Sequence, residues 1–192
     1  LPVVGTQSTY LTGHDEIHSL SQTLKIPTIR FWMGFGEHYI NVFTVLKSLG
    51  LLSEQPVKLD SGQEVVPLQL VKAVLPDPAS LAPDYAGKTC IGTLLEGEKD
   101  GKPREVFLYN ICDHAETFAE IGSQAISYTA GVPAVAAALL IADGTWDVGH
   151  MANVEELPPL PLLTLQAGMG LPTRVKEGSH DVALEEAPEI RA

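Results

Sequence analysis

The chain has 192 residues, of which 45% are hydrophobic and 19% are charged, the balance of a globular domain that can bury a sizeable core. Its formal net charge is −12, and residues 105–173 contain no Lys or Arg. Because the phosphates of nucleic acid are neutralised by Lys and Arg, this composition excludes nucleic acid as a partner. A cationic substrate such as an amine would instead be attracted to the acidic region. The simpler alternative is that the acidic residues only keep the chain soluble.

No apolar run in the sequence reaches the length of a membrane span. Residues 132–142 give the best run, which is about half of the roughly 20 apolar residues that a spanning helix needs. The first residues, Leu1 and Pro2, are followed by polar residues rather than by the basic and apolar regions of a signal peptide. We therefore expect a cytoplasmic protein with no membrane partner, and the lack of an initial Met suggests that the chain begins inside a longer protein.

The two cysteines are expected to be free thiols. Cys90 and Cys112 lie on the two arms of a predicted hairpin whose turn is Asp100 and Gly101. A two-residue turn at that position pairs Cys90 with Ile111 and leaves Cys112 on the opposite face, so no disulfide forms in this register.

The first half of the sequence predicts two short strands, an amphipathic helix, a small hairpin and a second helix. Glu37 stands in the first turn of the amphipathic helix and Gly50 at its C-cap. Pro67 takes the favoured first position of the second helix, and Pro76 stops that helix. The predicted elements are residues 8–12, 28–33, 37–49, 57–66 and 67–75. The apolar stripe of the amphipathic helix is Tyr39, Val42, Phe43, Leu46 and Leu49.

The second half predicts a loop, a long hairpin and a long helix. The loop covers residues 76–87, and loops of this length in compact domains are often functional. The hairpin arms are residues 88–99 and 104–113, and the helix runs from about 123 to 143. Pro133 lies inside that helix and predicts a kink or a restart, because proline removes a backbone donor. The expected buried stripe is Ala125, Tyr128, Val132, Val135 and Leu139.

The prolines at 158–161 are expected to break regular structure, and residues 174–192 to form a flexible acidic tail. Taken together, the order of elements predicts an α/β fold of the α+β kind. We expect one mixed β-sheet with helices packed on it.

The sequence contains no clear cofactor or metal motif. The Gly-x-Gly segments that start at Gly34 and Gly168 lack the third glycine of a dinucleotide fingerprint. His14 and His18 have the spacing of a zinc-protease motif, but the glutamate between them is third rather than second and would point off the ligand face. We therefore expect no metal site. No Gly-x-Ser-x-Gly elbow is present, which argues against a hydrolase.

Two acid–histidine pairs are the best candidates for acid–base chemistry or amine binding. Glu37 and His38 follow a Gly-x-Gly turn at a helix start, and Asp113 and His114 end a strand. Sites in α/β proteins collect at strand ends and helix starts, so the two pairs could converge. An equally weighted alternative is that Glu37 and Asp113 only cap helices.

A polar run before the long helix is the second candidate region. Ser123, Gln124 and Thr129 offer hydrogen-bonding groups, and a backbone restart near residues 131–133 would add free N–H groups suited to a carboxylate or a phosphate. Simple capping of the helix is the alternative.

Five stretches of the chain resemble the second half of the polyamine-biosynthetic enzymes of the saccharopine dehydrogenase family. The resemblance runs in order from about residue 10 to 173. The stretches are FWMGFGEHY (31–39), VLPDPASLAPDYAGKT (74–89), YNICDH (109–114), GSQAISYTAGVPA (122–134) and NVEEL (153–157).

The resemblance implies an oxidoreductase that uses NADPH to reduce the imine formed between aspartate semialdehyde and a diamine, giving carboxynorspermidine or carboxyspermidine. It implies a homodimer whose Rossmann domain precedes this chain and binds most of the NADPH. On this basis residues 1–120 would form the substrate-binding and dimerisation domain, like the C-terminal domain of glyceraldehyde-3-phosphate dehydrogenase. Residues 121–173 would return to complete the nucleotide domain.

The site residues can then be given expected roles. Binding or protonation of the substrate amine is expected for Glu37, His38, Asp113 and His114. The cofactor-facing side is expected to hold Ser123, Gln124 and Thr129. Two alternatives stay open: a saccharopine-type reductase of lysine metabolism, and a non-catalytic dimerisation or ligand-binding module.

Overall fold

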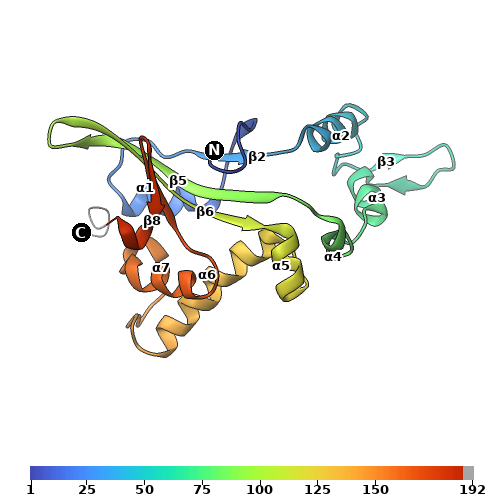
Figure 1. The fold of residues 1–192 in the computed structure, drawn as a ribbon. Helices are drawn as coiled ribbons and strands as arrows, with labels where there is room; N and C mark the ends of the chain where they lie inside the picture. The colour runs from blue at the N-terminus through green and yellow to red at the C-terminus, as the bar shows by residue number, and fades with distance from the viewer. Residues whose placement is uncertain (188–192) are drawn as a thin grey trace.

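The centre of the fold is a four-stranded antiparallel sheet. The computed structural model describes residues 1–187, and its main sheet has the strand order β5-β6-β7-β8. These strands are β5 (Lys88–Lys99), β6 (Lys102–Asp113), β7 (Arg174–Glu177) and β8 (His180–Ala183). The long β5–β6 hairpin runs across the molecule in Figure 1.

The turn of this hairpin is formed by Asp100 and Gly101, which have φ angles of 55° and 72°. Positive φ at both residues is what a type I′ hairpin turn requires. The turn pairs Cys90 with Ile111, so the predicted register is confirmed. Cys90 and Cys112 are free, and burial raises the pKa of both thiols, which keeps them protonated and weakly nucleophilic.

In the described part of the chain, three α-helices follow β6, and they are α5 (His114–Ile121), α6 (Ala125–Ala142) and α7 (Pro159–Gly168). Two of them, α6 and α7, pack on one face of the sheet, and α5 lies at the end of β6 (Figure 1). The buried residues of α6 recur every three or four positions, at Ala125, Tyr128, Val132, Ala136 and Leu140. The predicted stripe is right as far as Val132, but Val135 and Leu139 are about half exposed.

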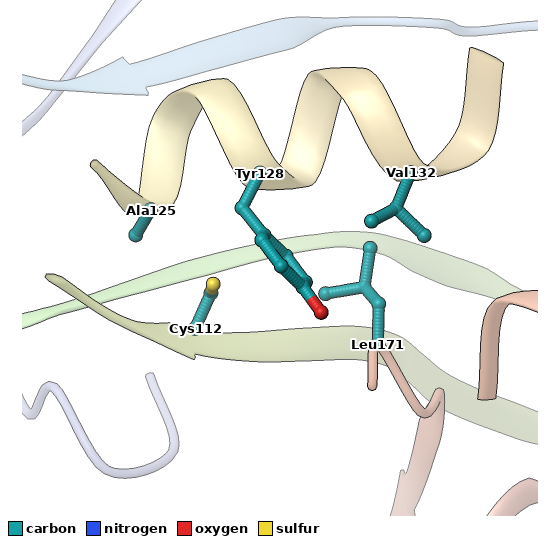
Figure 2. Packing of buried hydrophobic residues seen from close by; sticks show 5 residues of the cluster. All are labelled: Cys112, Ala125, Tyr128, Val132 and Leu171. Carbon is teal, nitrogen blue, oxygen red and sulfur yellow. The ribbon is translucent and has the colours of Figure 1, made fainter. Parts of the chain in front are cut away.

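The first core cluster joins α6 to the end of β6. Figure 2 shows Tyr128 reaching from the helix toward Cys112 on the strand and Leu171 in the loop before β7. The Tyr128 hydroxyl donates a hydrogen bond to the carbonyl of Met169 at 2.7 Å, so this buried polar atom is satisfied. Ala136, which is fully buried, packs with Leu162 of α7 in another cluster. Each fully buried large aliphatic side chain contributes about 1.5–3 kcal/mol to folding.

The N-terminal segment forms a separate two-stranded sheet. Strands β1 (Thr9–Thr12) and β2 (Phe31–Gly34) pair antiparallel, on either side of helix α1 (Asp15–Thr23). Helix α1 contacts the short 3₁₀ turn Val154–Glu156, where the hydroxyl of Thr23 donates to Glu155 at 3.2 Å. This contact ties the N-terminal segment to the region between α6 and α7.

Residues 37–76, which we call the arm, project from the sheet in Figure 1. The arm contains α2 (Glu37–Ser48), β3 (Val57–Lys58), β4 (Glu64–Val65) and α3 (Pro67–Val74). Within it only Pro67 and Val71 are buried. After the arm, α4 (Pro78–Leu81) and the 3₁₀ turn Ala82–Asp84 lead into β5.

Helix α2 forms where the sequence predicts it, but its apolar stripe is not buried within this chain. The rings of Phe35, Tyr39 and Phe43 stack along the helix, with centroids 5.1 and 6.2 Å apart. Tyr39 is 53% exposed and Leu49 is 67% exposed. The stripe therefore has no covering surface among the described residues.

The sequence-based fold class is confirmed as a mixture of helices and strands, and three details differ. All strand pairs among residues 1–187 are antiparallel, in three separate sheets, rather than in one mixed sheet. Helix α5 was not predicted. Helix α7 begins at Pro159, inside the proline run expected to break structure, because prolines in a first turn lack only N–H groups that have no helical partner.

Residues 174–187 were expected to be a flexible tail, and this expectation was wrong. They form β7, β8 and a 3₁₀ turn, with Val175 and Leu184 in a core cluster. The buried hydroxyl of Tyr109 donates to Asp181 at 2.7 Å, and the guanidinium of Arg174 donates to both of them. The rest of the predicted tail, residues 188–192, lies outside the described part of the chain.

Helix α6 continues through Pro133 as one helix, so the predicted restart near 131–133 is not seen. By length and composition alone α6 could also cross a membrane, and its 18 residues exceed the apolar run counted in the sequence. Its buried residues pack against β6 and α7, as those of a core helix do.

Candidate functional site

Asp113 stands where β6 ends and is the N-cap of α5. Its Oδ1 accepts hydrogen bonds from the N–H groups of Ala115 at 2.8 Å and Glu116 at 3.2 Å. Its Oδ2 lies 3.2 Å from Nζ of Lys88. The hydrogen bond from Glu116 and the contact with Lys88 lower the pKa of the Asp113 carboxyl. The carboxylate is therefore ionised at neutral pH and committed to the helix start, as the capping alternative predicts.

His114 is buried beside it, with 8% of its surface exposed. Its Nδ1 accepts a hydrogen bond from the N–H of Ala125, the first residue of α6, at 3.2 Å. Its own backbone N–H donates to the carbonyl of Gly87 at 3.0 Å. The ring of Tyr85 lies against the imidazole, with centroids 5.2 Å apart. His114 thus joins the end of the sheet, the 78–85 segment and the start of α6.

A recess of about 170 Å³ lies between α4 and the start of α6. Its polar lining comes from Ser123, Gln124 and Ser127, and its apolar wall includes Pro78 and Ala82. The Oε1 atom of Gln124 is buried and has no hydrogen-bond partner among the described residues. Such orphaned atoms are uncommon in folded proteins, and the other one among the described residues, Oγ1 of Thr12, does not line the recess.

The other predicted site residues do not meet at this recess. The Thr129 hydroxyl donates to the carbonyl of Ile126 at 3.1 Å and does not line it. Glu37 and His38 are exposed at the start of α2 in the arm. Among the described residues, no hydrogen bond, ion pair or ring contact joins either of them to Asp113 or His114. The structure brings His114 near Ser123 and Gln124 and leaves the remaining candidates apart.

Sequence reasoning missed the part that the 78–85 segment has in this region. Pro78 and Ala82 wall the recess, and Tyr85 covers His114. The length of the loop at residues 76–87 was a signal for function, but no residue pattern within it pointed to these contacts. Asp77 fixes the segment by capping α4, accepting the N–H of Ala79 at 2.9 Å.

The recess can hold one small group but not a dinucleotide. Its volume is below the roughly 300–1,000 Å³ of pockets for drug-sized ligands. The hydroxyls of Ser123 and Ser127 and the start of α6 suit a single carboxamide, carboxylate or phosphate group. Most of any nicotinamide cofactor must therefore be held by other residues. Within residues 1–187, no three His, Cys, Asp or Glu side chains gather as metal ligands.

Comparison with known proteins identifies the family to which the chain belongs. Residues 1–171 match the family described as the Saccharopine dehydrogenase C-terminal domain. The chain belongs to the saccharopine dehydrogenase family, as the resemblance in the sequence predicted.

Individual relatives narrow the similarity further. The chain is 47% identical over 176 residues to the carboxynorspermidine synthases of Vibrio alginolyticus and Vibrio cholerae, covering 92% of this chain and 42% of each relative. It is 48% identical over 174 residues to the carboxyaminopropylagmatine dehydrogenase of Synechocystis, covering 89% of this chain and 43% of that protein. The chain therefore spans less than half the length of these relatives.

Proposed function

We propose that this chain is the substrate-binding and dimerisation part of an NADPH-dependent reductase of polyamine biosynthesis. The observation that carries the proposal is the identity of 47–48% to three enzymes. Each of them is named for a product or substrate that is a carboxylated aminopropyl amine. A Rossmann domain outside this chain would hold most of the NADPH, in keeping with the small recess. The protein would act in the cytoplasm, where free Cys90 and Cys112 are stable thiols.

The proposed reaction is a reductive condensation. The aldehyde of aspartate semialdehyde and a primary amine lose water to form an imine. The chemistry that NADPH supplies when bound is a hydride to the imine carbon, and a proton to nitrogen completes the secondary amine. The absence of Lys and Arg from residues 105–173 supports binding of a cationic amine in this half of the chain. Contacts of Glu37 and His38 with that amine stay predictions.

An assay on the protein that carries this chain tests the proposal. NADPH oxidation is followed with aspartate semialdehyde and, in separate arms, 1,3-diaminopropane, putrescine or agmatine. We expect oxidation that depends on both the aldehyde and one amine, with a product mass equal to the reduced condensate. If NADPH is oxidised with 2-oxoglutarate and lysine, but with none of the three amines and aspartate semialdehyde, the saccharopine-type alternative would be supported instead.

We also propose that the arm forms part of a homodimer interface. The chain exposes 13591 Å², whereas a compact monomer of 20.6 kDa exposes about 8,900 Å² by surface scaling. The excess is about 4,700 Å² per chain, more than one partner's share of an obligate interface, which buries about 2,000–5,000 Å² summed over both partners. The arm has only two buried apolar residues, and the strands of its hairpin have two residues each. Such a small unit has little stability of its own, so the arm requires a covering surface.

Sedimentation measurements on charge variants test this dimer. Phe43→Glu in the arm should convert the dimer to a monomer. Leu139→Glu on the outer face of α6 is the matched control, because the two side chains are 44% and 48% exposed. A dimer that survives Phe43→Glu and dissociates with Leu139→Glu would place the interface on α6 instead.

A further inference from the structure

Two consecutive residues at the end of β6 serve the starts of two consecutive helices. Asp113 accepts the N–H groups of Ala115 and Glu116 in the first turn of α5, and His114 accepts the N–H of Ala125 at the start of α6. The N-cap residue of α6, Gln124, makes no side-chain cap of its own. His114 therefore satisfies a helix-start donor that the local sequence leaves open.

We propose that His114 is a positioning residue, which fixes the loop of residues 122–124 beside the recess, and that it does not transfer protons. Only the expected effect on kcat rests on the proposed function. The geometric part depends on the hydrogen bond at 3.2 Å between Ala125 N and His114 Nδ1, and on the 8% exposure of the histidine.

The tautomer follows from the hydrogen bond. A ring nitrogen that accepts a backbone N–H carries no proton, so the proton of the neutral imidazole lies on Nε2. To act as a base, the ring would need the Nδ1 lone pair that Ala125 already uses. To act as an acid from Nε2, it would have to become an imidazolate. Neither step is open while α6 keeps this contact.

The loop that His114 holds has little other support. Gly122 ends α5 in the left-handed region, with φ of 67°, and the chain turns through Ser123 and Gln124 into α6. The backbone N–H of Gly122 closes α5 on the carbonyl of Phe118. Together with the packing of Ala125 and Tyr128 against Cys112, the hydrogen bond to His114 sets the start of α6 relative to the sheet, and with it the polar lining of the recess. Tyr85 covers the ring from the other side.

The test compares His114→Asn with His114→Phe. The Asn side chain can place a carbonyl oxygen near the position of Nδ1 but does not titrate, whereas Phe fills the space without an acceptor. Amide hydrogen exchange at Ala125 should be close to wild type in the Asn variant and at least about tenfold faster in the Phe variant. An acid–base role would instead lower the kcat of the Asn variant by about 10²–10⁴-fold while exchange at Ala125 stays normal.

A ¹⁵N NMR measurement of the wild-type imidazole gives a readout that needs no variant. The proposal expects the resonance of an unprotonated Nδ1 and a protonated Nε2. A proton on Nδ1, or a 100-fold loss of kcat in an Asn variant with normal exchange at Ala125, would overturn it. If the enzyme lacks the proposed reductase activity but shows the expected exchange and tautomer, the proposed function fails and the positioning contact stands.

Discussion

Helix α6 in the core and helix α2 in the arm are both rich in apolar residues, and they differ in what covers them. Five of the 18 residues of α6 are buried, by β6, α7 and the loop before β7. None of the 12 residues of α2 is buried. The difference shows that an apolar stripe predicts a helix reliably but does not say whether its partner surface lies in the same chain.

The largest effect is expected at Gly92 in β5. A Cβ at this position would lie 2.6 Å from the Cβ of Tyr109, 2.9 Å from the ring of Phe107 and in contact with the carbonyl of Leu108. Since backbone atoms cannot move aside without separating the strands, Gly92→Ala should cost about 4 kcal/mol or more. Gly97→Ala in the same strand meets nothing within 4 Å and should be near neutral in urea unfolding.

Matched leucine truncations compare the two regions directly. Leu140 in α6 is 5% exposed, and Leu75 at the end of α3 is 60% exposed. Leu140→Ala should lower the free energy of unfolding by about 3 kcal/mol, because it leaves a cavity. Leu75→Ala should change it by less than about 0.5 kcal/mol, measured at a concentration where the protein sediments as a monomer. Equal losses in the monomer would mean that the arm is as well packed as the core.

Matched tyrosine substitutions have a smaller expected effect. Tyr109→Phe removes the hydroxyl that donates to Asp181 and accepts from Arg174 in the core. Its expected cost is about 2 kcal/mol, seen as a shift of the urea midpoint. Tyr39→Phe in the arm is the control, because the Tyr39 hydroxyl makes no hydrogen bond within residues 1–187. An unchanged midpoint for Tyr109→Phe would show that β8 does not depend on this network.

The smallest expected effect is a change in how stability depends on pH in the acid range. The pKa of Asp113 is lowered in the folded state, so its contribution to stability is present at neutral pH and is lost as the pH falls below the ordinary value of 3.8. Asp113→Asn should flatten this acid limb in a pH series of unfolding midpoints. A limb that stays steep in Asp113→Asn would have to come from other carboxylates.

Local signals predicted the elements well, and tertiary contacts decided the rest. Pro67, Gly50 and the Asp100–Gly101 pair placed helix ends and the hairpin because their backbone preferences act within a few residues. The strands at 174–183 were missed because their stability comes from Tyr109 and Val106, about 70 residues away in sequence. Helix α5 was missed because it follows β6 directly, with no loop between them. Helix α3 is equally short, but Pro67 marks its start.

The same division applies to the site. Asp113 and His114 were identified by their place at a strand end, and the structure confirms that place and the capping alternative for Asp113. Convergence with Glu37 and His38 could not be judged from the sequence, because it depends on where the arm points. The contact of Tyr85 with His114 likewise arises from the path of a loop that has no periodic pattern.

The length and register of the β5–β6 hairpin fix the position of Asp113 beside the recess. Its two arms have 12 residues each, and counting from Asp100 and Gly101 brings Lys88 opposite Asp113. One residue more or fewer in β6 would turn Asp113 to the other face of the sheet and away from Lys88. The geometry of the recess is thus set by a turn at the far end of the molecule, so the spacing between these two places is under tighter constraint than the identity of the exposed residues between them.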